Sequence, residues 1–248
     1  MESLGTVDKA VDLLFQLRAS AGPQRATALG RALGTPKSST HRLLSTLCRR
    51  GLVERDEGGC YRPGFALVAL GLGVLDAEPL VSASRAILEH HAAAIGETFF
   101  LVAARANQLV VLHKAEGSGF LRAAPRVGST VPTHATAVGK LFLALAPDSI
   151  HLEPAPLPSY TPHTLTDPGS LAQSVALARR RAWAASRDEW VAGLSVLAVP
   201  VWRAGRMQAA LALAAATPRL DSLGELAVLH QLERAAAEIA TRLEGGST

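Results

Sequence analysis

Apolar positions at the start of the chain recur at the spacing of a helix. They lie three or four residues apart, with charged or amide side chains between them: Val7, Val11, Leu14 and Leu17. This spacing predicts an amphipathic helix with these side chains on its buried face, and Thr6 can cap its start. The Gly22-Pro23 pair then breaks the chain. A short second helix is expected over 26–33, ending at Gly34, which suits a left-handed C-cap.

A third helix is predicted directly after this glycine, across a three-residue turn. Thr35 is the expected N-cap and Pro36 the first helical residue. One face of the helix is formed by Thr40, Leu43, Leu44 and Leu47, and the other by Ser38, Ser39, Arg42, Ser45 and Arg49. Short hydroxyl side chains let a backbone approach the DNA major groove, and arginine can contact guanine or phosphate. The third helix is therefore predicted to be a recognition helix.

Two short strands are expected after Gly51, over 52–55 and 60–62, around the Gly-rich turn 56–59. Three helices followed by a hairpin predict a winged helix-turn-helix, although any three-helix cluster with a hairpin shows the same pattern. The residues predicted to contact DNA lie in the third helix and the hairpin: Lys37, Ser38, Ser39, His41, Arg42, Arg49, Arg55 and Arg62.

The formal net charge of +4 lies entirely in this part of the chain. Residues 1–75 contain ten Lys or Arg and six Asp or Glu, whereas residues 76–248 contain fifteen of each. Such asymmetry is a cue for a polyanionic partner, although taken alone it is more commonly explained by a solvated basic face. Together with the predicted helices, the charge supports binding to double-stranded DNA.

Ordered sequence blocks along the whole chain resemble the isocitrate lyase regulator (IclR) family of bacterial transcription factors. The blocks are VDKA (7–10), PKSSTHRLLSTL (36–47), GLVER (51–55), YRPG (61–64), GET (96–98), VPTHATAVGK (131–140) and GLSVLAVPV (193–201). The resemblance implies an α+β protein with a winged helix-turn-helix domain over 1–64, a linker helix over 65–76 and an effector-binding domain over 77–248. It also implies an antiparallel sheet flanked by helices in the last domain, and assembly as a homodimer or a dimer of dimers.

The pattern of the remaining chain agrees with this organisation. Residues 65–75 are apolar on all sides, so we expect them to be buried against a second subunit or another domain. A helix should then continue through His91. Strands are expected over 98–104, 109–114, 120–123, 195–201 and 207–215, and helices over 137–145, 171–183 and 220–243.

A Thr-rich loop before the helix at 137 is the candidate effector site. Free N–H groups at a helix start favour a carboxylate or phosphate, and Thr133 and Thr136 are the polar candidates there, although plain N-capping explains them equally well. In relatives that sense glyoxylate and pyruvate, the effector meets loop amides that match Thr136 and Ala137. It also meets an Asp, a Cys and two Ser, and these match Ser186, Val196, Ala212 and Ala214 here.

The loss of the thiol and of two hydroxyls leaves a small polar acid with too few partners. We therefore expect a weakly polar effector, such as an aromatic or medium-chain carboxylate. Phe99, Leu101 and Trp190 are possible walls of the site, although a place in the core is the favoured interpretation of each.

The sequence predicts neither catalysis nor a metal or cofactor. The segment Gly193-Leu194-Ser195 lacks the second glycine of a nucleophile elbow, and the histidines have no ligand spacing. A hydrolase with a basic structural appendage is the alternative to a regulator. With two cysteines and neither an export signal nor an apolar run of bilayer length, a cytoplasmic protein without membrane contact is expected. Activator or repressor, and dimer or tetramer, stay open.

Overall fold

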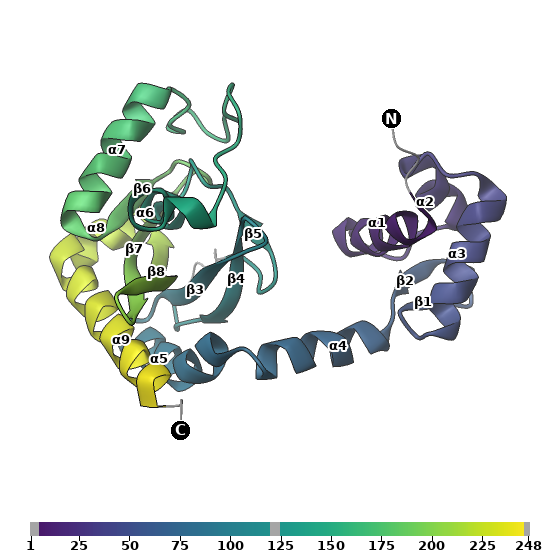
Figure 1. Ribbon diagram of the computed structural model, residues 1–248, viewed down its shortest axis with the longest axis horizontal. Coiled ribbons are helices and arrows are strands. Elements are labelled where there is room, and N and C mark those ends of the chain that lie inside the picture. The colour runs from purple at the N-terminus through teal and green to yellow at the C-terminus, as the bar shows by residue number, and fades with distance from the viewer. Residues whose placement is uncertain (1–4, 120–124, 246–248) are drawn as a thin grey trace. The chain divides into compact units, whose positions relative to one another are not determined.

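The computed structural model describes residues 5–119 and 125–245 (Figure 1). The chain divides into two compact units, Met1–Ala77 and Glu78–Thr248. Among the described residues, no single helix has the length and apolar composition needed to cross a bilayer, and one helix pair, Phe65–Asp76 with Pro79–Ile95, reaches them only when both are counted together.

The first unit is a winged helix-turn-helix, as expected. Its helices are α1 (Thr6–Ala19), α2 (Ala26–Ala32) and α3 (Lys37–Arg49), followed by the antiparallel pair β1 (Val53–Arg55) and β2 (Tyr61–Pro63) and by α4 (Phe65–Asp76). Leu13, Leu29 and Leu44 from the three helices meet in one core, which the hairpin closes with Val53 and Tyr61. The predicted caps shift by one residue, because Gly5 and Pro36 take the cap positions that we expected for Thr6 and Thr35.

Helix α1 is apolar on two faces, which corrects the predicted stripe. Leu13 and Leu17 are buried, but Val7 and Val11, which we expected in the core, are 75% and 44% exposed. Phe15 is 61% exposed and follows Val11 by four residues, so these three side chains form a second apolar line on the helix surface.

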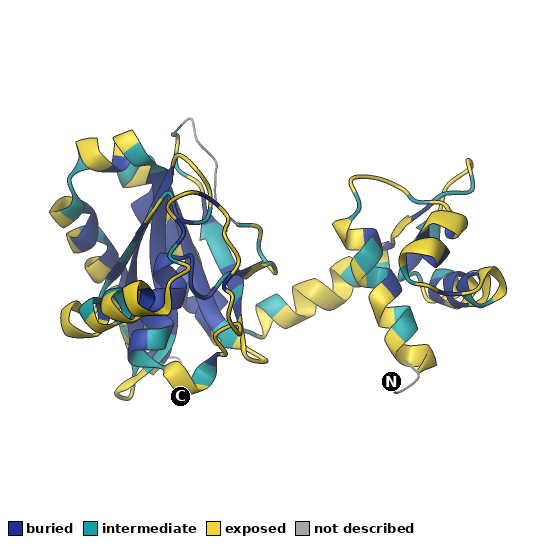
Figure 2. Cartoon of the chain, turned by 90° about the horizontal axis from the view of Figure 1, so that it is seen from above, coloured by how far each residue is buried: buried dark blue, intermediate teal, exposed yellow. Residues whose placement is uncertain are grey.

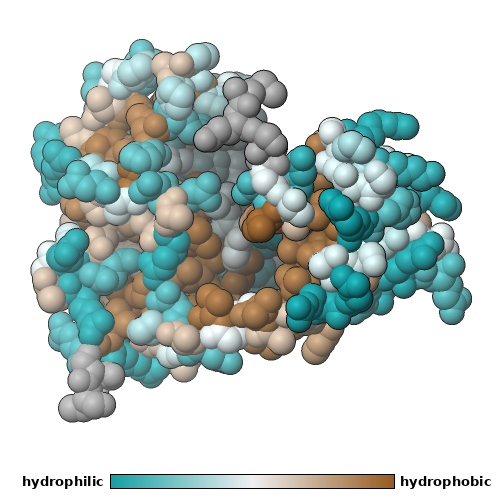
Figure 3. Space-filling model, turned by 45° about the vertical axis from the view of Figure 1, so that its right-hand side comes forward, coloured by the Kyte–Doolittle hydropathy of each residue, from teal (hydrophilic) through white to brown (hydrophobic). Residues whose placement is uncertain are grey.

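Helix α4 has no buried residue within this chain (Figure 2). Its exposed apolar side chains are Phe65, Val68, Leu70, Leu72 and Val74. Hydrophobic residues accordingly reach the surface in this part of the molecule (Figure 3). Packing within the first unit leaves this apolar helix uncovered.

As far as its residues are described, the second unit is a six-stranded antiparallel sheet with helices on both faces. The strand order is β5 (Thr130–Val131), β4 (Gln108–Ala115), β3 (Thr98–Arg105), β8 (Arg206–Ala216), β7 (Leu194–Arg203) and β6 (Ala184–Arg187). Helices α6 (Ala137–Leu145) and α7 (Pro168–Arg181) pack together on one face, and α5 (Pro79–Ile95) and α9 (Glu225–Gly245) on the other. The remaining helices are the short η1 (Pro147–Ser149) and α8 (Thr217–Leu223).

Three features of this unit differ from the sequence expectations. The expected helix over 220–243 is two helices, because Gly224 adopts φ +81° between α8 and α9, a conformation that favours glycine. The two short strands β5 and β6 were not predicted. The expected strand over 120–123 lies outside the described residues.

Candidate functional site

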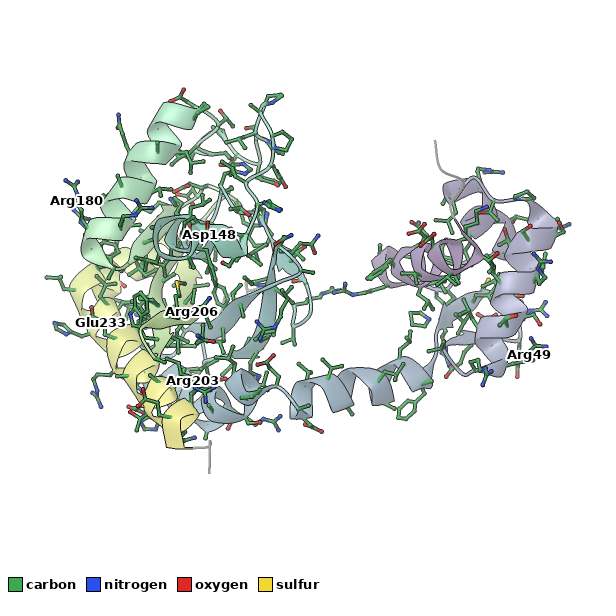
Figure 4. All side chains as sticks on the ribbon, viewed as in Figure 1. Arg49, Asp148, Arg180, Arg203, Arg206 and Glu233 are labelled. Carbon is green, nitrogen blue, oxygen red and sulfur yellow. The ribbon has the colours of Figure 1, made fainter. Side chains whose placement is uncertain are left out.

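The outer face of α3 carries most of the predicted DNA-contacting side chains. Thr40, Leu43, Leu44 and Leu47 point into the core of the first unit, as their spacing predicts. This leaves Lys37, Ser38, His41, Arg42, Ser45 and Arg49 exposed and Ser39 half-buried. Arg49 lies at the C-terminal end of the helix (Figure 4). The outer face of α3 therefore carries basic and hydroxyl side chains, most of them in its first two turns.

The two predicted arginines of the hairpin are both engaged within the chain. Arg62 donates from Nε and Nη2 to Oε2 of Glu54, at 3.0 and 2.9 Å. The Arg55 guanidinium lies 5.7 Å from the centre of the Tyr61 ring. The Arg62 hydrogen bonds and the amide of Phe65 lower the pKa of Glu54. A phosphate would therefore compete with Glu54 for Arg62.

In the second unit, a narrow apolar cavity lies between the sheet and α6. Its floor is a row of directly opposed residues on three neighbouring strands, Ser186, Val196 and Ala214. The remaining walls are Phe100, Pro125, Val131, Thr136, Val138, Trp190, Val191 and Leu194. The space within it that a sphere the size of a water molecule can reach is about 20 Å³, about the room for one water molecule. The described side chains therefore leave little room for a guest larger than water.

The first turn of α6 supplies the polar end of this cavity. Thr136 is the N-cap: its Oγ1 accepts a hydrogen bond from the Gly139 amide at 3.0 Å and donates one to the Pro132 carbonyl at 2.7 Å. The amides of Ala137 and Val138 precede the first intrahelical hydrogen bond, so they can donate to an anion. Gly139 is required here, because a Cβ at this position would lie 1.9 Å from the Thr133 carbonyl oxygen.

The predicted effector residues are distributed over three places. Thr136, Ser186, Val196 and Ala214 line the cavity. Ala137 and Ala212 are fully buried in the adjoining core. Ala212 lies opposite Ala198 and Phe100 on the two neighbouring strands, two residues along β8 from the cavity residue Ala214. Thr133 instead lines a more open groove with Tyr160 and His151, and Trp190 borders both spaces.

The other wall residues were only partly foreseen. Of the three aromatic and aliphatic candidates, Trp190 lines the cavity, whereas Phe99 and Leu101 have no exposed surface and lie outside its lining. Phe100 takes their place because β3 alternates and directs this side chain toward α6. Among the described residues, no cluster of His, Cys, Asp or Glu is arranged to hold a metal ion.

Comparison with known proteins identifies two matching family models. The IclR helix-turn-helix domain matches residues 6–57, and the bacterial transcriptional regulator IclR C-terminal domain matches residues 72–241. The probable transcriptional regulator SauR of Cupriavidus necator is 33% identical, over 85% of this chain and 84% of the relative. The transcriptional regulator XynR of Escherichia coli is 29% identical and covers 98% of each chain.

Solved structures agree with these matches. A putative IclR transcriptional regulator from Silicibacter is 30% identical, with a TM-score of 0.79 over 96% of each chain. An IclR homologue from Microbacterium hydrocarbonoxydans, complexed with 4-hydroxybenzoate, is 25% identical, with a TM-score of 0.82 over 98% of this chain and 100% of that chain.

Proposed function

Since the chain belongs to the IclR family of bacterial transcriptional regulators, we propose that it binds operator DNA as a homo-oligomer and responds to a weakly polar organic acid. Its relatives are transcriptional regulators, so the hydrolase alternative is excluded and the chain is a regulator rather than an enzyme. An operator-binding protein with two free cysteines, Cys48 and Cys60, suits the reducing cytoplasm.

The exposed face of α3 is the observation that carries the DNA-binding assignment. Ser38, Ser39, His41 and Arg42 are proposed to read base edges, while Lys37 and Arg49 contact phosphates. Arg55 and Arg62 are proposed as phosphate contacts of the wing, and the bonds of Arg62 to Glu54 use its Nε and Nη2.

Arg42→Ala tests this assignment on a duplex obtained by binding-site selection. If Arg42 reads a base, the variant should lose about 1 to 3 kcal/mol of discrimination between the selected duplex and random DNA. Arg31→Ala, at an exposed position in the last turn of α2, is the matched control. Uniformly weaker binding with a shallower salt slope would make Arg42 a phosphate contact instead.

Two uncovered apolar faces support the proposed oligomer. The exposed line of α1 and helix α4, which has no buried residue, belong to the same unit, and a second copy of the chain would remove both from water. Both half-sites of an operator would then be bound by one assembly, which is either a dimer or a dimer of dimers.

The lining of the cavity supports a weakly polar acid as the effector. Among the described lining residues, only Thr136 and Ser186 bring hydroxyls to it, and the opposed Val196 and Ala214 are apolar. The carboxylate is proposed to bind the free amides of Ala137 and Val138, with its apolar body over the strands. A relative that binds 4-hydroxybenzoate is consistent with this chemistry.

Calorimetric titration with benzoate-type and pyruvate-type acids tests the effector class. Binding of the aromatic acids should be the tighter of the two, because a small keto acid leaves polar groups unpaired against Val196 and Ala214. A preference for pyruvate or glyoxylate would refute the apolar cavity as the effector site.

A further inference from the structure

Two charged side chains are buried beside the cavity and bridge two of its walls. Lys140 on α6 is 2% exposed and Glu189, in the loop between β6 and β7, is 10% exposed, with 2.7 Å between Nζ and Oε1. Lys140 follows the wall residue Val138 by two positions, and Glu189 directly precedes Trp190. The ion pair therefore connects the helical wall to the wall formed by the loop 188–193.

Buried hydroxyls bind the same loop from a second direction. Thr164 Oγ1 donates to the Glu189 carbonyl at 2.6 Å, and Thr161 Oγ1 donates to the Asp188 carbonyl at 2.5 Å. The backbone of Glu189 is thus bonded to the 161–164 segment while its side chain is bonded to α6.

Hydrogen bonds join the end of the loop 188–193 to its beginning. Oδ1 of Asp188 accepts from the Gly193 amide at 2.7 Å and from Thr217 Oγ1 at 2.9 Å, and the Asp188 amide donates to the Leu194 carbonyl at 3.0 Å. The loop backbone is held at both ends. Trp190 and Val191 lie between these two ends and line the cavity.

Burial of the Lys140–Glu189 pair carries a desolvation cost, so the pair is weak evidence for added stability. Burial lowers the pKa of Lys140, and the Glu189 carboxylate offsets only part of that shift. Oε2 of Glu189 is buried without a hydrogen-bond partner in the described part of the chain. Apolar residues of similar volume often replace such a pair at no cost in stability, whereas breaking one half is strongly destabilising.

We propose that Lys140 and Glu189 are positioning residues for the effector: their ion pair holds the loop 188–193 at a fixed separation from the first turn of α6, so that Trp190 forms a wall of defined position. The inference rests on the proposed effector function of this cavity. It assigns the pair to cavity shape, and neither residue needs to contact the effector.

The first test uses the unmodified full-length protein. Amide hydrogen exchange of Asp188, Gly193 and Leu194 should be about tenfold or more slower than that of the exposed segment 151–156, because these three amides donate hydrogen bonds within the loop and, among the described residues, no amide of 151–156 does. Exchange of these three amides at the same rate as 151–156 would overturn the proposal without any variant.

The second test removes the pair. In Lys140→Met/Glu189→Leu the melting temperature should stay near that of the wild type, while exchange of 188–194 rises about tenfold. Trp190 fluorescence, isolated by Trp183→Phe and Trp202→Phe, should become more easily quenched by acrylamide. Unchanged exchange and quenching in a folded double variant would refute the positioning role.

A control variant and a titration with one ligand distinguish a failure of this proposal from a failure of the effector assignment. Glu97→Gln alters another buried acid, which pairs with Arg219 at 2.9 Å and lies outside the cavity lining, so it should leave exchange of 188–194 unchanged. The affinity for 4-hydroxybenzoate should fall about tenfold in the double variant and stay unchanged in the control. If the wild type does not bind 4-hydroxybenzoate, this choice of effector fails, while the exchange and quenching results still decide the role of the pair.

Discussion

Thr136 is both the N-cap of α6 and part of the cavity lining. Its substitution therefore tests how much the cap contributes to the stability of the second unit. Thr136→Ala removes the N-cap of α6, which is worth about 1 kcal/mol. It also leaves the Pro132 carbonyl without the hydroxyl donor at 2.7 Å, which costs about 1 kcal/mol more. The free energy of unfolding should fall by about 2 kcal/mol, or about 4 to 8 °C in melting temperature.

Tryptophan fluorescence during urea unfolding is the suitable assay, because Trp183, Trp190 and Trp202 all lie in the second unit. Thr136→Ser is the matched control: it keeps both hydrogen bonds and loses one methyl group, which costs about 0.8 kcal/mol. Equal losses for Thr136→Ala and Thr136→Ser would show that packing of the methyl, and not capping, stabilises this turn.

Three further results are expected. Leu70→Glu places a charge on the apolar surface of α4, so sedimentation should show weakened self-association, and a fully associated variant would exclude this helix from the interface. Ala214→Ser puts a hydroxyl into the cavity floor and should weaken benzoate-type ligands by about 1 to 3 kcal/mol in calorimetry, unless they carry a polar group there. Burial, helped by Arg85 and opposed by Glu89, lowers the pKa of His113. The unfolded chain then binds more protons, so stability should fall as the pH drops below about 6.5, and urea unfolding of His113→Leu should show a smaller loss.

The winged helix-turn-helix was predictable because its signals are local. The inner face of α3 follows from the spacing of Thr40, Leu43, Leu44 and Leu47, and the hairpin from its glycines. The error in α1 has a physical cause. Apolar residues on two faces satisfy the same helical period, and only the packing of Leu13 and Leu17 shows which face is inside.

The cavity was less accessible to sequence reasoning. Strand β3 is buried from Thr98 to Ala103, because helices cover both faces of the sheet, so alternation could not decide between Phe99 and Phe100. Lys140 and Glu189 are 49 residues apart, and no local pattern connects them. The positions Ser186, Val196 and Ala214 came from the family resemblance, and strand register explains why they meet.

Hydrogen bonds join the start of α4 to the hairpin, so a rotation of this helix carries the hairpin with it. Glu54 Oε1 accepts from the Phe65 amide at 3.2 Å, and the Gly51 carbonyl accepts from the Ala66 amide at 3.1 Å. Its 12 residues extend over about 18 Å, so a rotation of about ten degrees at one end displaces the other by about 3 Å. That displacement is close to the rise of one base pair, about 3.4 Å. If α3 reads base edges as proposed, a change of about ten degrees in the direction of α4 would shift it by about one base step.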